Sequence, residues 1–190
     1  MYSLSVPKEN IPTKKQHIAD DIKRLMDTYG NDVLRTSYMY LKDVQKAEDA
    51  FQEIYIKVFK KYEGFNGESS EKTWIIKITI NVCNDILRSS WLKRVLVTDK
   101  INTQSIGSDV ESIVMEKDEG KQLFDVVTSL KFVYKEIIIL YYYQEFDTLE
   151  ISKILNIAEG TVRSRLYRAR EILKKKIGRR TDLRERYEGF

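Results

Sequence analysis

The sequence contains little cysteine, histidine or proline, and each shortage excludes something. The single cysteine, Cys83, cannot form an internal disulfide, and with the single histidine, His17, it cannot supply a usual set of zinc ligands. Both prolines precede residue 13, so proline interrupts none of the later periodic segments. We interpret Cys83 as a small buried hydrophobe and His17 as a solvated side chain. No metal site and no cofactor are expected.

Long apolar runs are also missing. No segment approaches the ~18 apolar residues that a membrane-spanning helix needs. The N-terminal segment, MYSLSVPKENIPTKKQH, lacks the apolar core and the small-residue cleavage site of a signal peptide. Hydrophobic residues make up 42% of the chain, which is enough for packed cores, and charged residues make up 33%. We therefore expect a cytoplasmic protein that does not insert directly into a membrane.

Positive charge is concentrated at the C-terminal end. The formal net charge is +4, but residues 159–190 hold eleven Lys and Arg against five Asp and Glu. The remaining 158 residues therefore carry a net charge of −2. An excess of this kind on one helix and a tail indicates a polyanionic partner, although a basic helix can also be simply solvated.

Apolar residues recur at helical spacing along most of the sequence, which predicts an all-α fold. Segment 17–41 is expected to form two helices around Gly30, and segment 43–62 has the most regular helical pattern. Residues 63–73 contain glycine, asparagine and serine and predict a loop. A further helix is expected from about residue 72 to residue 92.

Periodicity is lost between residues 93 and 115, which predicts a linker between two small helical domains. The apolar segment 137–143, IIILYYY, could also form a buried strand, but its helical neighbours and the lack of a partner strand favour a helix. The predicted division is a flexible leader 1–16, a domain 17–92, a flexible linker 93–115, a domain 116–178 and a charged tail 179–190.

Residues 147–175 have the pattern of a helix-turn-helix. Asp147 precedes a short amphipathic helix, and Glu150 three residues later completes an acidic variant of the capping box. Asn156 can adopt the left-handed conformation that ends this helix. A longer basic helix begins at about Glu159. In a helix-turn-helix, the second helix enters the major groove of DNA.

The basic helix has one apolar stripe. Its members are Val162, Leu166, Ala169 and Leu173. The predicted DNA-contacting residues are Arg163, Ser164, Tyr167 and Arg168, which face outward with Glu171, and Arg170 and Lys174 on the adjoining flank. Arginines near the helix start can reach guanine edges, whereas the flanking cations suit phosphates. Arg165, beside the apolar stripe, is a candidate structural residue.

Two helices of the N-terminal half also have unusual surfaces. The outward face of helix 43–62 is expected to carry Gln45, Asp49, Gln52, Glu53 and Ile56. An exposed isoleucine among acids and amides suits a contact patch, although a solvated face remains an equal alternative. Helix 72–92 has two apolar sides, one containing Ile75, Ile78 and Val82 and the other containing Ile76, Ile80 and Cys83.

Between these apolar sides runs a narrow polar stripe. It consists of Lys77, Asn81, Asn84 and Arg88, spaced by four, three and four residues. The stripe could be the only solvated edge of a buried helix. It also suits nucleic acid, because Lys and Arg can hold phosphates and Asn can contact base edges.

The C-terminal half resembles a known family. The segment EGTVRSRLYRARE, preceded by LEISKILNI and LKFVYKEIIILYYYQEF, is similar to the promoter-recognising C-terminal domain of extracytoplasmic-function (ECF) sigma factors. Two positions depart from the family pattern. Ala158 stands where a capping Ser or Thr is common, and Lys131 replaces the usual proline after Leu130. Losing an N-cap costs ~1 kcal/mol of helix stability but does not change the outward face.

The N-terminal half resembles the same family. Residues 47–59, AEDAFQEIYIKVF, are similar to the segment with which sigma factors bind the coiled coil of the largest RNA polymerase subunit. The resemblance implies that Asp49, Gln52 and Glu53 contact the polymerase, and the patch analysis adds Ile56. Both resemblances occur in the order that the family has, with a non-matching segment between them.

Residues 65–89 resemble the family segment that acts at the −10 promoter element. The resemblance implies that Phe65, the loop 66–71 and Asn81 line a pocket for a base flipped out of the duplex, which costs a few kcal/mol. Asn66 and Glu71 replace the usual arginine and aromatic residue of that loop. With the polar stripe, the candidate −10 residues are Phe65, Asn66, Lys77, Asn81, Asn84 and Arg88.

The resemblance implies an alternative sigma factor that binds core RNA polymerase, recognises the −10 and −35 elements and promotes DNA melting. It also implies an anti-sigma factor as a partner and no covalent chemistry, and we find no catalytic nucleophile–base pair in the sequence. A stand-alone helix-turn-helix regulator is the alternative, but it would not explain residues 47–59 and 65–89. An enzyme or a protein scaffold would need a substrate pocket or a dimer seam that the sequence does not show.

Overall fold

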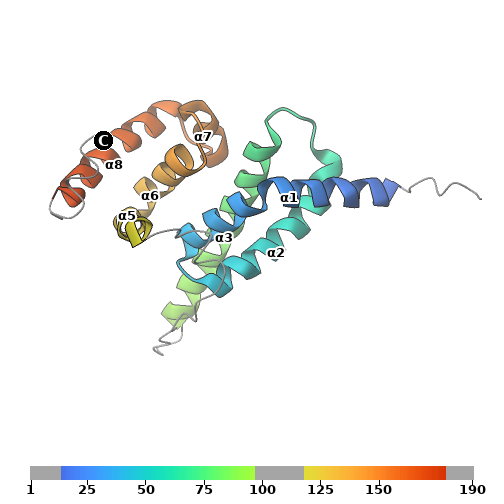
Figure 1. Cartoon of the computed structure of the whole chain (residues 1–190), viewed down its shortest axis with the longest axis horizontal. Coiled ribbons are helices and arrows are strands. Elements are labelled where there is room, and N and C mark those ends of the chain that lie inside the picture. The colour runs from blue at the N-terminus through green and yellow to red at the C-terminus, as the bar shows by residue number, and fades with distance from the viewer. Residues whose placement is uncertain (1–13, 97–117, 179–190) are drawn as a thin grey trace, which may run out of the picture.

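The structure, a computed structural model, describes residues 14–96 and 118–178, and every regular element within these ranges is helical (Figure 1). The all-α prediction is confirmed. The N-terminal unit contains α1 (Lys14–Leu41), α2 (Val44–Lys61), a short 3₁₀ turn η1 (Tyr62–Gly64) and α3 (Glu71–Leu96). The C-terminal unit contains α5 (Asp118–Thr128), α6 (Phe132–Ile138), the π-helical turn η2 (Ile139–Tyr143), α7 (Thr148–Leu155) and α8 (Glu159–Ile177).

The predicted break at Gly30 is wrong, because α1 is continuous from Lys14 to Leu41. A glycine inside a helix costs about 1 kcal/mol relative to alanine, which tertiary packing can offset. Gly30 lies against the ring of Phe51, since a Cβ added to it would be 3.7 Å from that ring. The chain reverses instead at Lys42, which has a positive φ of 54°, and Asp43 caps α2 by accepting a hydrogen bond from the Lys46 amide.

The start of α3 is held to α1. Arg24 donates hydrogen bonds of 2.7 and 2.9 Å to the two carboxylate oxygens of Glu71, the first residue of α3. The Arg24 guanidinium lowers the pKa of Glu71. Glu71, where the family has an aromatic residue, therefore fixes the end of the loop before α3.

The helical prediction for residues 137–143 is confirmed. These residues end α6 and continue as η2, whose Ile139 and Leu140 are fully buried. The π-helical turn ends at Gln144, whose amide bonds the carbonyl of Ile139. Gln144 is itself buried, with 3% of its surface exposed.

Two apolar cores form, and α3 contributes to both. In the first, Ile75, Ile78 and Val82 of α3 pack with α1 and α2. In the second, Ile76, Ile80 and Cys83 pack with the end of α1 and with residues of the C-terminal unit, including Leu140 and Ile151. The two apolar sides expected for this helix are thus both buried, one inside the N-terminal unit and one between the units. Burial also raises the pKa of the Cys83 thiol to about 11.

Several predicted segments lie outside the described residues. Residues 1–13 of the predicted leader, 97–115 of the predicted linker and 179–190 of the predicted tail belong to this group. The described part of the predicted linker, residues 93–96, continues α3, so this helix extends beyond the predicted end at residue 92.

Candidate nucleic-acid and protein interfaces

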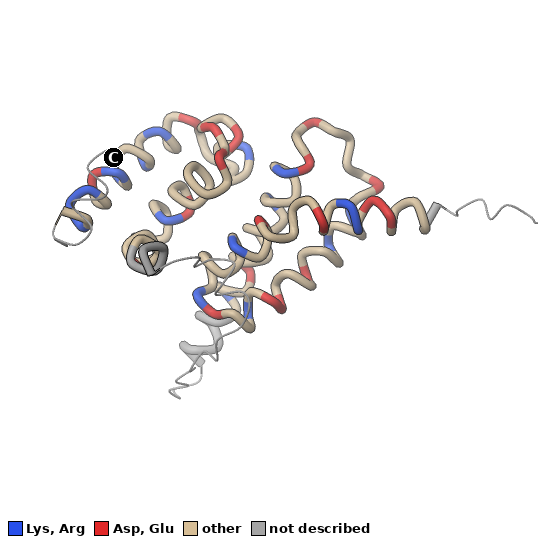
Figure 2. The backbone as a smooth tube through the Cα atoms, viewed as in Figure 1, with Lys and Arg blue, Asp and Glu red and all other residues tan. Residues whose placement is uncertain are grey.

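The basic face of α8 is exposed, as its sequence pattern predicts. Val162, Leu166, Ala169 and Leu173 are buried against the C-terminal core. Lys and Arg follow α8 along its length (Figure 2). The outward residues are Arg163, Ser164, Tyr167, Arg168, Arg170 and Lys174, all exposed. Tyr167 is 68% exposed, which is unusual for a large aromatic residue and suits a contact surface.

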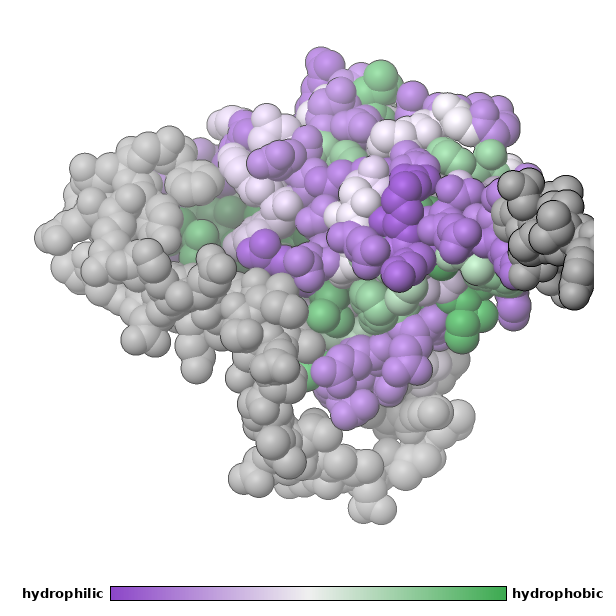
Figure 3. Space-filling model, turned by 45° about the vertical axis from the view of Figure 1, so that its right-hand side comes forward, coloured by the Kyte–Doolittle hydropathy of each residue, from purple (hydrophilic) through white to green (hydrophobic). Residues whose placement is uncertain are grey.

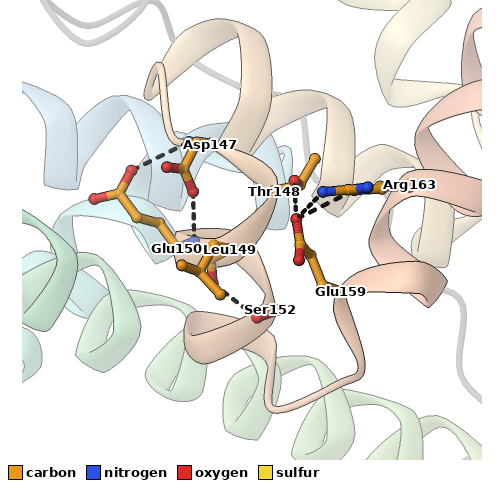
Figure 4. A network of polar contacts seen from close by, with 7 residues as sticks. All are labelled: Asp147, Thr148, Leu149, Glu150, Ser152, Glu159 and Arg163. Atoms are coloured by element: carbon orange, nitrogen blue, oxygen red, sulfur yellow. Dashed lines mark hydrogen bonds and ion pairs between the residues drawn. The ribbon is translucent and has the colours of Figure 1, made fainter.

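The turn before α8 is fixed by the predicted capping box (Figure 4). The Glu150 amide donates to the Asp147 carboxylate at 2.7 Å, and the Asp147 amide donates to the Glu150 carboxylate at 3.1 Å. Asn156 ends α7 in the left-handed conformation, with φ 53° and ψ 50°. Both predictions are confirmed, and together they set the direction in which α8 leaves the turn.

The start of α8 has a different support. Ala158 provides no side-chain cap. Instead, the Glu159 carboxylate accepts hydrogen bonds from the Thr148 hydroxyl at 2.6 Å and from Arg163 at 2.7 Å, which lower the pKa of Glu159 (Figure 4). Arg163 must therefore exchange Glu159 for DNA when it binds a base or a phosphate.

The remaining cations of α8 fall into two groups. Arg170 donates to the Tyr142 hydroxyl at 2.8 Å and lies over the rings of Tyr141 and Tyr142. Arg165 lies 3.5 Å from the Glu136 carboxylate of α6, the contact expected of a structural residue. Arg168 and Lys174 form no ion pair within the part of the chain that the structure describes. Both are therefore available for DNA without breaking an existing pair.

An apolar groove lies beside the predicted contact patch of α2. Asp49, Gln52 and Glu53 are exposed, and Ile56 is 55% exposed. The groove has a volume of about 310 Å³, and its lining comprises Met26, Phe51, Gln52, Tyr55, Ile56, Phe59 and Lys60. Sequence analysis missed Phe59, which is 46% exposed and one turn after Ile56, and Met26, which comes from α1. Exposed apolar atoms gather in separate patches on an otherwise hydrophilic face (Figure 3).

A second cavity opens beside the loop before α3. The rings of Phe65 and Trp74 lie 4.8 Å apart and form one wall. The cavity measures about 420 Å³, and its lining comprises Gly64, Phe65, Asn66, Glu68, Ser69, Thr73, Trp74, Lys77 and Lys153. Lys153 belongs to α7, so sequence spacing within 65–89 could not have found it.

The structure brings only some of the candidate −10 residues together. Phe65, Asn66 and Lys77 line the cavity, whereas Asn81 does not. Asn81 and Arg88 are exposed and Asn84 is half-buried, further along the same face of α3. This is a polar track that leads away from the cavity, which suits a strand of nucleic acid passing over it.

No helix within the described ranges is long and apolar enough to cross a membrane. The same ranges contain no group of three or more His, Cys, Asp and Glu side chains placed to hold a metal ion.

Comparison with known proteins places these surfaces in one family. The chain matches Sigma-70 region 2 over residues 25–93 and Sigma-70 region 4 over residues 121–173. The chain is 30% identical over 141 residues to the ECF RNA polymerase sigma-E factor of Escherichia coli K12, covering 68% of this chain and 72% of that protein. It is 27% identical over 179 residues to the ECF sigma factor SigW of Bacillus subtilis, covering 90% and 96%.

Solved structures agree at the level of the fold. The Bartonella quintana sigma factor RpoE, in complex with the anti-sigma factor NepR, superposes with a TM-score of 0.67 at 23% identity over 82% of this chain and 96% of that one. CnrH, in complex with the cytosolic domain of CnrY, gives 0.64 at 14% identity over 88% and 96%.

The two surfaces and two matched regions define a sigma factor, a class of proteins that are not enzymes in the usual sense. The chain belongs to the ECF family of RNA polymerase sigma factors and is an alternative sigma factor for transcription initiation. The interpretation as a stand-alone helix-turn-helix regulator is not favoured.

Proposed function

We propose that this sigma factor binds core RNA polymerase through α2, the −10 element through the cavity beside Phe65, and the −35 element through α8. The proposal rests on one observation. The three surfaces predicted from separate motifs are each exposed, and each has the chemistry that its ligand requires. The proposed domains, 17–92 and 116–178, would divide these tasks between them.

The α2 surface suits a protein partner. Ile56 and Phe59 are exposed beside a groove, and Asp49, Gln52 and Glu53 surround them with polar groups. An apolar centre with a polar rim is the usual anatomy of a protein interface. The proposed partner is the coiled coil of the largest polymerase subunit.

The cavity beside Phe65 suits an unpaired base. Aromatic rings stack on bases at about 1–3 kcal/mol per base. Asn66 offers an amide to a base edge, and Lys77 offers a cation to a phosphate. On α8, Arg163 and Arg168 are placed for the major groove, with Ser164 and Tyr167 between them, while Arg170 and Lys174 suit the phosphates.

An anti-sigma factor is the second proposed protein partner. The support is a solved relative of the same fold, RpoE of Bartonella quintana, whose structure contains the anti-sigma factor NepR. We also propose a cytoplasmic location, where core polymerase and the chromosome are found.

A reconstituted transcription assay tests the assignment of the α2 surface. The double variant Glu53→Arg with Ile56→Asp should lose at least 100-fold in association with core polymerase, because it reverses a rim charge and places a carboxylate on the apolar centre. Circular dichroism melting checks that the variant is folded. Asp85→Arg on the exposed side of α3 is the matched control and should bind normally. A folded double variant with unchanged binding would contradict the assignment.

A further inference from the structure

The two DNA-binding units are joined by buried polar contacts. Lys135 of α6 is 6% exposed, and its ammonium group donates to the carbonyls of Met39 at 3.3 Å and Tyr40 at 3.1 Å, at the end of α1. The Gln144 amide donates to the Thr36 hydroxyl of α1 at 3.0 Å. These contacts connect residues about a hundred positions apart, so they are tertiary contacts between the units.

Further contacts join α3 to the turn before α7 and to α7 itself. Lys72 donates to the Gln144 carbonyl at 3.0 Å, and the Thr73 hydroxyl donates to the Glu150 carboxylate at 3.2 Å. The rings of Tyr38 and Phe124 stack with centroids 5.3 Å apart. The interface therefore touches the start of α3, beside the proposed −10 cavity, to which α7 contributes Lys153.

This interface is costly to keep closed. It buries a lysine, and burial lowers the pKa of Lys135 to about 8. The Tyr40 hydroxyl and the Gln144 side-chain oxygen are buried without a hydrogen-bond partner among the described residues. Opening the interface returns all of these groups to water, so part of the apolar contact that is lost is offset.

The closed arrangement is too short for a promoter. The −10 and −35 elements lie about 25 base pairs apart, which is about 85 Å of duplex at 3.4 Å per base pair. Thr73 contacts α7, and Thr148 of α7 contacts the start of α8. Since the 19 residues of α8 span about 28 Å, its far end lies within about 50 Å of Thr73.

We propose that this packing is an autoinhibited closed state, which holds the −10 and −35 surfaces too close together for one promoter and opens when the promoter is engaged. The inference rests on the proposed roles of those two surfaces. In the closed state, the outward residues of α8 and the α2 patch remain exposed. Closure therefore leaves polymerase binding and isolated −35 binding intact, and it blocks only the simultaneous use of both elements.

A reversible cross-link tests this asymmetry. The Lys72 side chain already spans the gap to Gln144, so Lys72→Cys and Glu145→Cys can be joined by a reducible bis-maleimide of similar length. The native Cys83 is fully buried and should not react. The locked protein should bind core polymerase and a −35 duplex normally but form open complexes at least tenfold more slowly on a full promoter. Reduction should restore the rate.

Separate outcomes identify separate failures. If the unlocked protein fails to bind a −35 duplex, the proposed function of α8 is wrong. If the locked holoenzyme forms open complexes at the unlocked rate, the autoinhibited state is wrong.

A distance measurement decides the matter independently of the cross-link. Dyes attached at Lys61 of α2 and Lys175 of α8, both exposed, should move apart by at least about 30 Å when core polymerase and promoter are added, from the difference between the two lengths above. An unchanged distance would overturn the proposal, whatever the cross-linked protein does.

One substitution weakens the closed state specifically. Thr36→Val removes the acceptor of the Gln144 amide and should raise the open fraction of the free protein about tenfold. Thr28→Val is the matched control, because Thr28 bonds only the carbonyl of Arg24 on its own helix. Equal dye distances in both variants would also contradict the proposal.

Discussion

The two proposed DNA-binding surfaces are built in different ways. On α8, one apolar stripe is buried and the rest of the helix is exposed, so a single helix carries the whole −35 surface. Beside α3, the surface consists of a loop, two aromatic rings and a lysine from another helix, while α3 itself is buried on two sides. A surface of the first kind tolerates independent changes of its side chains. A surface of the second kind depends on packing as well as on contact.

The largest expected effect is at the cavity. Phe65→Ala should slow open-complex formation by about 10- to 100-fold, because a stacked aromatic contributes about 1–3 kcal/mol per base. Binding to a −35 duplex should stay the same, since Phe65 is far from α8 in the chain and in its packing. Single-round transcription beside duplex binding measures both. A uniform loss in both assays would mean that Phe65 acts only through stability.

A base-contacting arginine should give the next largest effect. Arg168→Ala should lower affinity for the preferred −35 sequence by about 1–3 kcal/mol and relax the preference at one position. Binding to a library of −35 variants measures this. An affinity loss that is equal for every sequence would assign Arg168 to the phosphate backbone.

Asn81 separates the polar track from the cavity. Asn81→Ala should reduce melting of the −10 region more than it reduces closed-complex formation, because Asn81 is proposed to act on unpaired bases. Permanganate footprinting of the −10 thymines measures melting directly. Unchanged reactivity would make the stripe of α3 only a solvated edge.

Arg165 should affect stability. Burial raises the pKa of Glu136, and Arg165 opposes this rise. Arg165→Ala should therefore raise that pKa further and destabilise the fold by about 1–3 kcal/mol at pH 8. A carboxyl whose pKa is raised in the folded state loses stability as pH increases above its unfolded value, so the deficit should be smaller near pH 5.

Thermal melting of Arg165→Ala at both pH values tests the sign of this dependence. Adding Glu136→Gln removes the buried charge and should recover most of the lost stability. A deficit that is the same at both pH values, or that Glu136→Gln does not reduce, would show that Arg165 acts through packing alone.

The smallest effect is expected from Lys174. Lys174→Ala should weaken binding to all −35 sequences alike and reduce the salt slope by about one unit, as one phosphate contact is lost. Affinities at several salt concentrations measure the slope. A sequence-dependent loss would move Lys174 from the phosphate group to the base-contacting group.

The same contrast explains what could be predicted from the sequence. The buried stripe of α8, the capping box and the left-handed Asn156 depend on residues close together in the chain, and all three are confirmed. The break at Gly30 was wrong because contact with Phe51, which lies on another helix, decides that position. Local preference alone could not show this contact.

Contacts between distant segments were the part that could not be predicted. The second apolar side of α3 was visible in the sequence, but its partner was not. Met26, Lys153 and Lys135 come from other helices than the motifs they join, and no spacing rule connects them. The motif residues of a site can thus be found from sequence, whereas the cavity and the interface require the fold.

The most direct measurement is open-complex formation by reconstituted holoenzyme on a promoter library randomised at both elements. The wild-type protein, Phe65→Ala and Arg168→Ala are compared on the same library. We expect Arg168→Ala to change preference only within the −35 element and Phe65→Ala to change the outcome only within the −10 element. If each variant altered preference at both elements, or if the wild-type protein selected no sequence, the assignment of two separate DNA-binding surfaces would be contradicted.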